Sequence, residues 1–249
     1  MAMKILAINP NTTHAMTDAI KSAAQAAAGP GTEVLAVQPT FGPVSVECHY
    51  DEAVAAAGVA EQARHAALLK PDAVVIACFG DPGLDAAREA LDVPVLGIAE
   101  AAFHAASLVA TGFSVVTTLT RTCRTAEHLL DRYGFGPVCR GVHGTDIPVL
   151  ALEAAGDVVA RQIEDAARAA LARDRSGAIV LGCAGMAPLC ARLSTRLGVP
   201  VIDGVAAAVA LSEALVRMGL RTSKTGDYAR PPQKSYSGWA AALGWPAGR

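Results

Sequence analysis

The sequence predicts an α/β fold of two similar lobes, each a parallel sheet flanked by helices and related to the other by pseudo-twofold symmetry. Two observations lead to this expectation. Short β-branched runs alternate with longer alanine-rich stretches, which is the rhythm of parallel strands joined by helices. Landmarks in the first half of the chain also recur about 106 residues later, which indicates an internal duplication.

Eight short runs have the apolar, β-branched character of strands that are buried on both faces. The first series is expected at residues 4–8, 33–37, 73–77 and 93–98. The second series is expected at residues 113–117, 138–142, 178–181 and 199–202. Helices are expected in the alanine-rich segments between the strands, because alanine has the highest intrinsic helix propensity.

Four pairs of landmarks keep a nearly constant spacing. A Val-Pro-Val motif recurs after 106 residues, and a cysteine that closes a strand recurs after 105. A polar residue that follows or ends the first strand recurs after 106 residues, and the glycine that ends the next helix recurs after 107. A chance register is the alternative, but four agreeing landmarks favour duplication. The pairs are Val93 and Val199, Cys78 and Cys183, Asn11 and Thr117, and Gly112 and Gly219.

The duplication also predicts how the chain divides. We expect residues 1–98 and 205–249 to form the first lobe and residues 99–204 the second, with crossings near 99–112 and after Gly204. The tail, residues 221–249, is rich in proline, glycine, lysine and tyrosine and has little periodicity. We expect it to wrap a lobe or to join a subunit interface.

Composition and charge exclude several classes of function. The net charge is −2 with lysine and arginine scattered, and aromatic residues make up 4% of the chain, so no nucleic-acid partner is expected. No run of about 18 apolar residues lacks a charge or a breaker, so no membrane association is expected. The opening segment is too short for a signal peptide, and a cytoplasmic location is therefore expected.

Cofactor and metal chemistry are not expected either. The six cysteines have no CxxC pairing and no histidine-rich spacing, so they predict reduced thiols and no metal site. No glycine-rich GxGxxG loop follows a strand, so no nucleotide cofactor is expected. The expected ligand is a small-molecule substrate.

Two cysteines occupy places where ligands are expected to bind. Cys78 follows a buried strand, and Asp81 with Pro82 is expected to open the next helix. Cys183 repeats this arrangement between glycines. In open α/β sheets ligands bind at the carboxyl ends of strands, and a helix N-terminus there favours a thiolate. A buried structural thiol is the alternative for each cysteine, but two at equivalent places indicate function.

Two opposed groups of one kind suit proton exchange at a stereocentre. One base removes the proton from a carbon next to a carbonyl, and its counterpart returns a proton to the opposite face. Because the reaction runs both ways, the two groups must be near equivalents, which a pseudo-twofold cleft supplies. We therefore expect Cys78 and Cys183 to be catalytic. A covalent nucleophile is the alternative, but no histidine lies in a motif beside either cysteine.

Polar residues at strand ends are candidates for substrate contact. Asn11 and Thr12 follow the first strand and can donate hydrogen bonds to an enolate oxygen, together with backbone N–H groups of the next helix. The equivalent segment of the second lobe holds Thr117, Thr118 and Thr120. Helix capping is the alternative role for such side chains.

Further contacts are expected in a loop and beside the cysteines. Ser45 lies in an irregular segment after the second strand and is either a substrate contact or an ordinary turn residue. Glycines beside the cysteines let backbone and substrate approach closely. The expected contacts that flank the cysteines are Phe79, Gly80, Gly182 and Ala184.

At these residues the chain resembles the aspartate/glutamate/hydantoin racemase superfamily, with hydantoin racemases the nearest likeness and allantoin racemases next. The resemblance spans residues 4 to about 236. It implies that the protein has two lobes, that a thiol pair catalyses the reaction without a cofactor, and that the protein is a homo-oligomer. The motifs that carry it are Ile8-Asn-Pro-Asn-Thr12, Gly42-Pro-Val-Ser45, Ala77-Cys-Phe-Gly-Asp-Pro-Gly-Leu-Asp85 and Leu181-Gly-Cys-Ala-Gly-Met186.

Departures from other branches of this superfamily bear on the substrate. Glutamate racemases carry a threonine and a histidine after the second cysteine, where this chain has Ala184 and Gly185. The loss of polar groups that hold an amino-acid zwitterion favours a neutral cyclic ureide, such as a 5-substituted hydantoin. Arylmalonate decarboxylases keep one of the two cysteines, whereas maleate isomerases keep both. Allantoin racemase, aspartate or glutamate racemase and maleate isomerase stay open as alternatives.

A catalytically silent binding protein on the same fold is the non-enzyme alternative. Both cysteines would then be buried structural thiols. Alkylation separates the two hypotheses, because catalytic thiols are expected to react quickly and to be protected by ligand.

Overall fold

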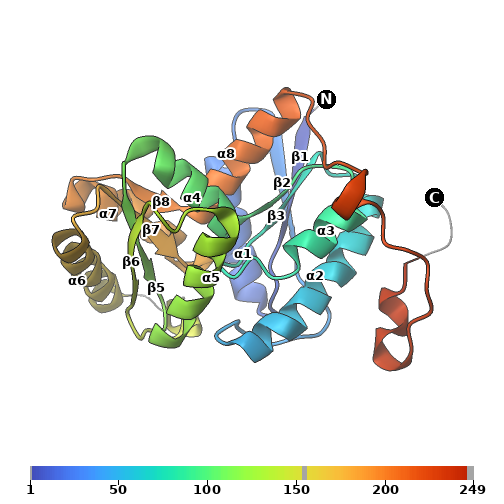
Figure 1. Cartoon of the computed structure of the whole chain (residues 1–249), viewed down its shortest axis with the longest axis horizontal. Helices are drawn as coiled ribbons and strands as arrows, with labels where there is room; N and C mark the ends of the chain where they lie inside the picture. Colours follow the sequence, from blue (N-terminus) through green and yellow to red (C-terminus); the bar gives the residue numbers. More distant parts are fainter. Residues whose placement is uncertain (1, 153–155, 246–249) are drawn as a thin grey trace.

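The structure, a computed structural model that describes residues 2–152 and 156–245, has two lobes side by side (Figure 1). The first lobe is built on a parallel sheet of order β2-β1-β3-β4, and the second on a parallel sheet of order β6-β5-β7-β8. The second order repeats the first with every strand four places later in the chain. The predicted fold class, two similar α/β lobes, is confirmed.

The elements alternate strand and helix along most of the chain. The strands are β1 (Met3–Ile8), β2 (Thr32–Val37), β3 (Ala73–Ile76), β4 (Val95–Gly97), β5 (Phe113–Thr117), β6 (Cys139–Gly144), β7 (Ala178–Gly182) and β8 (Val201–Asp203). The α-helices are α1 (His14–Ala27), α2 (His49–Leu69), α3 (Leu84–Ala90), α4 (Ile98–Val109), α5 (Cys123–Tyr133), α6 (Asp157–Asp174), α7 (Cys190–Leu197) and α8 (Gly204–Arg217). The 3-10 helices are η1 (Thr120–Thr122), η2 (Val149–Leu152), η3 (Ala184–Leu189), η4 (Gly226–Tyr228) and η5 (Gly238–Leu243).

All eight predicted strands are present, and several of their ends differ from the prediction. β4 and β8 begin later than expected because Pro94 and Pro200 lack the N–H group that a ladder position uses. Ile98, expected to end a strand, begins α4 instead. Cys78 lies two residues beyond the end of β3, whereas Cys183 directly follows β7.

Alternating strand residues pack against helices on the two faces of each sheet. In the first lobe, Ile5 and Val75 face the side of α1 and α8, whereas Leu6 and Val74 face the side of α2 and α3. The second lobe repeats this arrangement, with α4 and α5 on one face of the sheet and α6 and α7 on the other. These strand residues are fully buried, which matches the near-continuous apolar runs of the sequence.

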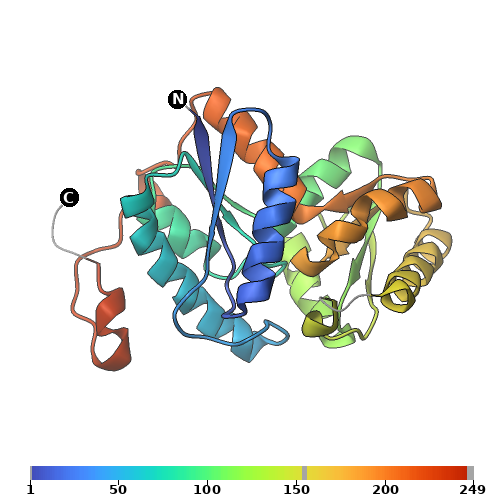
Figure 2. The same ribbon diagram turned by 180° about the vertical axis from the view of Figure 1, so that it is seen from behind.

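The chain crosses between the lobes through α4 and α8. Helix α4 follows β4 of the first sheet but packs on β7 and β8, and α8 follows β8 but packs on β3 and β4 (Figure 2). The two helices pack against each other, and one apolar cluster runs through both lobes, with Phe103 fully buried in it. These crossings lie where the sequence placed them. The domain boundaries at 98/99 and 204/205 stay a prediction.

The described part of the tail lies against the first lobe. η4 packs on α3, and the Lys224 ammonium donates to the Arg88 and Glu89 carbonyls at the end of that helix. Farther along, η5 packs on α2, and the Trp239 ring meets Phe41 edge to face. Residues 246–249 of the predicted tail lie outside the described residues.

Candidate active site

A cavity of about 50 Å³ lies between the carboxyl ends of the two sheets. It is lined from the first lobe by the segment after β1, the start of α2 and the Cys78 loop. From the second lobe it is lined by the ends of β5 and β7, by η2 and by the start of α5. The residues at its wall are Asn11, Met16, Val46, Glu52, Ala77, Cys78, Phe79, Gly80, Thr117, Thr118, Thr122, Thr125, Val149, Gly182, Cys183 and Ala184.

Nine of the twelve residues that the sequence predicted for the site line this cavity, the two cysteines among them. Ser45 is buried beside the cavity, while its neighbour Val46 lines it. Thr12 and Thr120 also lie outside the lining. The Thr12 hydroxyl donates to the Pro43 carbonyl, and the Thr120 hydroxyl donates to Asp146.

Asn11 is held so that its amide nitrogen faces the cavity lining. Its side-chain oxygen accepts hydrogen bonds from Asn9 Nδ2 at 3.0 Å and from the Thr13 backbone N–H at 2.9 Å. Its side-chain nitrogen contacts only the Met16 sulfur at 3.4 Å, which is a weak acceptor. Asn11 therefore supports the start of α1 and keeps N–H donors for a ligand oxygen, so the capping and contact roles are compatible.

In both lobes, glycines let neighbouring segments of the cavity wall approach each other closely. A Cβ atom at Gly182 would lie 2.6 Å from the Thr117 Cβ, and the Thr117 hydroxyl donates to the Gly182 carbonyl at 2.9 Å. A Cβ atom at Gly80 would lie 2.8 Å from a Glu52 carboxylate oxygen. The contact at Gly182 excludes a side chain there unless the strand moves, because the Thr117 Cβ and Cα atoms are fixed to the backbone. A side chain at Gly80 would displace only the flexible end of Glu52.

The two thiols share the cavity, and both resist ionisation. Burial raises the pKa of Cys78 to about 12, and the ionisable groups Cys183, Asp81 and Glu52 beside it add to the effect. Burial also raises the pKa of Cys183 to about 11, with Glu47 as the contributing charge. The N–H groups of Gly80 and Gly185, each two residues after its cysteine, oppose these shifts. The expectation that this site favours thiolates is wrong, because desolvation outweighs the backbone N–H groups.

The expected cap after Cys78 is also wrong. Helix α3 begins at Leu84, and its N-cap is Gly83, so neither Asp81 nor Pro82 opens it. The Asp81 carboxylate instead accepts hydrogen bonds from the first N–H groups of α4, the crossover helix. Burial raises the pKa of Asp81 to about 7 although these hydrogen bonds oppose the shift.

Seven lining residues were not nominated by the sequence. They come from a strand end, helices, a loop and 3-10 segments whose approach depends on packing: Met16, Val46, Glu52, Ala77, Thr122, Thr125 and Val149. Glu52 is the most informative, because it is the one charged side chain among the described residues that line the cavity. Its carboxylate lies 3.1 Å from His49 Nδ1 in the first turn of α2.

Other features of the described residues bear on the class of site. All six cysteines are free thiols. Within residues 2–152 and 156–245, no three His, Cys, Asp or Glu side chains gather as a metal site would require. None of the helices in this part of the chain combines the length and apolarity that a bilayer span needs.

Known proteins share both the sequence and the fold. The family model described as Asp/Glu/hydantoin racemase matches residues 5–212. A hydantoin racemase of Pseudomonas sp. (strain NS671) is 45% identical over 236 residues, which is 95% of each chain. The solved structure of an allantoin racemase from Klebsiella pneumoniae has a TM-score of 0.95 and 53% identity, and covers 97% of this chain and 99% of its own. That of an allantoin racemase from Pseudomonas fluorescens has a TM-score of 0.90 and 41% identity, and covers 95% and 100%. The resemblance is therefore confirmed, and the chain belongs to the Asp/Glu/hydantoin racemase family of isomerases.

Proposed function

We propose that this protein racemises a 5-substituted hydantoin, a small neutral cyclic ureide, with Cys78 and Cys183 as its two acid–base groups and without a cofactor. The observation that carries the proposal is that two thiols, one from each lobe at equivalent positions, line one cavity. A thiol pair on opposite sides of a ring carbon is the arrangement that inversion requires.

The proton transfers balance without any other reactant. The thiolate of one cysteine removes the proton from the ring carbon next to the carbonyl, and that cysteine becomes a thiol. The other cysteine, a thiol, gives its proton to the opposite face and becomes a thiolate. The enzyme form left behind is ready for the opposite enantiomer, and proton exchange with solvent between turnovers restores the first form, so both enantiomers are substrates. The Asn11 amide is in place to donate to the enolate oxygen that forms between the two transfers.

The high thiol pKa values fit this chemistry. A thiolate with a raised pKa is a stronger base than an ordinary cysteine, which helps it to remove a weakly acidic carbon-bound proton. The cost is that few enzyme molecules hold a thiolate at neutral pH. Backbone N–H groups at Gly80 and Gly185 support the thiolate when it forms.

The charge of the lining favours a neutral ligand over an amino acid or a dicarboxylate. Glutamate, aspartate and maleate carry carboxylates that a cationic side chain would hold, and the described lining contains no lysine, arginine or histidine. Glu52 would repel those carboxylates. A ureide ring instead offers N–H groups, which a carboxylate such as Glu52 accepts well.

A neighbouring cavity supports an apolar substituent on the ring. This second cavity, of about 290 Å³, shares Met16, Val149 and Ala184 with the first and is otherwise lined by carbon-rich side chains such as Ile20 and Leu152. An alkyl group would leave water on entering it, which is favourable. Allantoin, whose substituent is a polar ureido group, is the second candidate. It is favoured by the 53% identity to the Klebsiella pneumoniae allantoin racemase structure.

Polarimetry tests the proposal. The optical rotation of an L-5-alkylhydantoin is expected to decay to zero with the purified protein, faster than that of an allantoin enantiomer. Cys78→Ser and Cys183→Ser are each expected to lose several orders of magnitude in rate, because a serine hydroxyl is far too weak an acid. Cys190→Ser is the matched control, since Cys190 lies outside the cavity lining. Full activity of either cavity variant would contradict the two-thiol mechanism, and ligand binding without any racemisation would favour a silent binding protein.

Proton exchange in heavy water separates the two thiols. Each single variant keeps one thiol, which can remove and return a proton on its own face without inverting the carbon. One variant is therefore expected to exchange the ring proton of the L enantiomer only, and the other that of the D enantiomer only, as followed by NMR. Equal exchange of both enantiomers by both variants would mean that the thiols do not face opposite sides of the substrate.

A further inference from the structure

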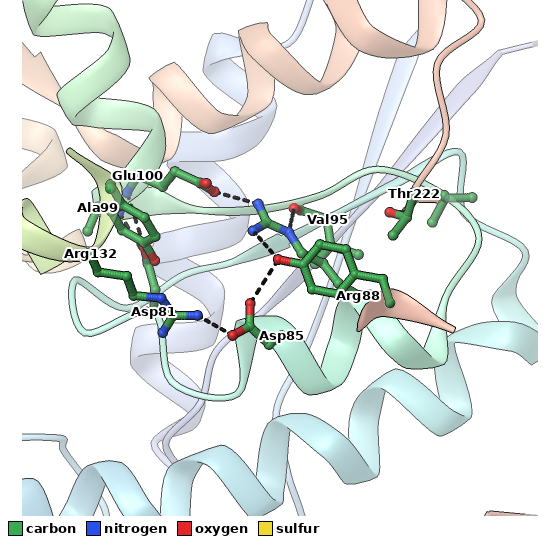
Figure 3. A network of polar contacts seen from close by, with 11 residues as sticks. Asp81, Asp85, Arg88, Val95, Ala99, Glu100, Arg132 and Thr222 are labelled. Carbon is green, nitrogen blue, oxygen red and sulfur yellow. Dashed lines mark hydrogen bonds and ion pairs between the residues drawn. The ribbon is translucent and has the colours of Figure 1, made fainter. Parts of the chain in front are cut away.

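Asp81 is a buried carboxylate in the turn that carries Cys78. Only 2% of the residue is exposed, and its backbone N–H donates to the Cys78 carbonyl at 3.0 Å. Its carboxylate accepts hydrogen bonds from the backbone N–H groups of Ala99 and Glu100, each at 3.0 Å, at the start of α4 (Figure 3). It also accepts a hydrogen bond from the Tyr133 hydroxyl at 2.9 Å. One side chain thus joins the cysteine turn to a crossover helix and to α5 of the other lobe.

The second lobe builds the same turn without this carboxylate. There the Met186 N–H donates to the Cys183 carbonyl at 3.0 Å, so Met186 holds the position that Asp81 holds in the first lobe. Helix α8 is capped from its own strand end, since Asp203 accepts from two N–H groups at the start of that helix. Gly97 is the equivalent of Asp203, because each is the last residue of its strand and the N-cap of a crossover helix.

Gly97 and Asp81 occupy complementary space. A Cβ atom at Gly97 would overlap the Asp81 carboxylate, so that carboxylate fills the volume that a side chain at Gly97 would take. Asp81 itself has a φ of +45°, a left-handed conformation that aspartate, asparagine and glycine tolerate best. In the second lobe the carboxylate that caps the crossover helix comes from the strand end, at Asp203, whereas in the first lobe it comes from the cysteine turn, at Asp81.

We infer that Asp81 is a positioning residue for Cys78: its carboxylate fixes the cysteine turn to α4 and to Tyr133, and so sets where the Cys78 thiol stands relative to Cys183 across the cavity. The inference rests on the proposed two-thiol function. An aspartate at position 97, like Asp203 in the second lobe, would cap α4 from its own strand end. Supplying the cap from the cysteine turn adds a connection between the lobes, which Tyr133 of α5 completes.

Enantiomer-specific exchange is the readout that a purely structural role would not move. In Asp81→Asn, which keeps the size and the tolerated backbone conformation, exchange at the enantiomer served by Cys78 is expected to fall about a hundredfold. Exchange at the enantiomer served by Cys183 is expected to change by less than about threefold, because that thiol is held by its own lobe. The Cys78→Ser and Cys183→Ser variants identify which enantiomer belongs to which thiol. Tyr133→Phe is expected to act in the same direction with a smaller loss.

Moving the cap back to the strand end separates positioning from helix stability. The double variant Asp81→Gly with Gly97→Asp restores the arrangement of the second lobe, because aspartate at the N-cap can accept from the first N–H groups of α4. Thermal stability is expected to return toward that of the wild type relative to Asp81→Gly alone, while exchange through Cys78 stays low. Asp203→Asn is the control in the other lobe, expected to weaken the α8 cap without shifting the ratio of exchange between enantiomers.

Different outcomes would contradict the positioning role of Asp81 and the two-thiol mechanism. Wild-type exchange in the double variant, or equal losses for both enantiomers in Asp81→Asn, would show that Asp81 only caps a helix. If the two cysteine variants themselves fail to show opposite enantiomer selectivity, the two-thiol proposal fails first.

Discussion

The two lobes share strand order, crossover helices and the turn that carries each cysteine, but they surround the two thiols differently. Cys78 has Glu52, Asp81 and the other thiol as negative or ionisable neighbours, whereas Cys183 has only Glu47 as a contributing charge. The duplication supplies equivalent positions for two groups of one kind. Divergence of the neighbouring side chains then gives those groups different electrostatic surroundings.

The largest expected effect is on the rate at which the two thiols react as the pH changes. With folded-state pKa values raised above the usual thiol value, the thiolate fraction at pH 7 is about one in ten thousand for a pKa of about 11. Alkylation of both cysteines is expected to rise about tenfold per pH unit, hence about a hundredfold between pH 7 and pH 9. Cys183 is expected to react before Cys78.

Mass spectrometry of the alkylated protein at several pH values measures both rates. Cys190→Ser removes one competing half-buried thiol. A rate that levels off by about pH 9 would show that the thiols ionise at an ordinary or lowered pKa. Slow alkylation at neutral pH does not separate an enzyme from a silent binding protein, because burial alone slows both, so protection by ligand is the decisive observation.

The second contrast concerns the caps of the crossover helices. Gly97→Ala is expected to destabilise the fold by about 2–3 kcal/mol, because the new methyl group displaces the buried Asp81 carboxylate from its hydrogen bonds. Asp203→Ala removes an ordinary N-cap and is expected to cost about 1 kcal/mol. Urea unfolding of the two variants beside the wild type measures the difference. A smaller loss for Gly97→Ala than for Asp203→Ala would contradict the view that the Asp81 cap is the more heavily connected one.

The sequence was sufficient for the features that depend on chain periodicity. The constant offset between landmarks predicted both sheets and placed Cys78 and Cys183 at one cavity, because equivalent strand ends of duplicated lobes face each other. The role of Asp81 was not predictable in this way. Because Asp81 is followed by proline near a helix start, the sequence predicts a local helix cap. Its actual partners, Ala99 and Tyr133, lie 18 and 52 positions away along the chain.

Residues that reach the cavity from a 3-10 segment or from the first turn of a helix were also beyond prediction. Val149 approaches through η2 and Glu52 through the first turn of α2, and neither segment has a periodicity that fixes its direction. The loop that holds Ser45 was predicted to reach the site, but the sequence did not predict which of its residues lines the cavity. The loop does reach the cavity, but Val46 lines it while Ser45 is buried outside the lining.

The smallest expected effect comes from this loop. Ser45 is 9% exposed, lies outside the cavity lining, and belongs to neither of the turns that carry the two thiols. Ser45→Ala is therefore expected to change kcat/KM for racemisation by less than about twofold, because it removes no group that meets the substrate. Val46→Ala, one position on, is expected to raise KM several-fold by enlarging the cavity wall. Polarimetric rates over a range of substrate concentrations measure both variants. A loss of tenfold or more in Ser45→Ala, with KM for Val46→Ala unchanged, would mean that the loop turns its hydroxyl toward the substrate when the ligand binds.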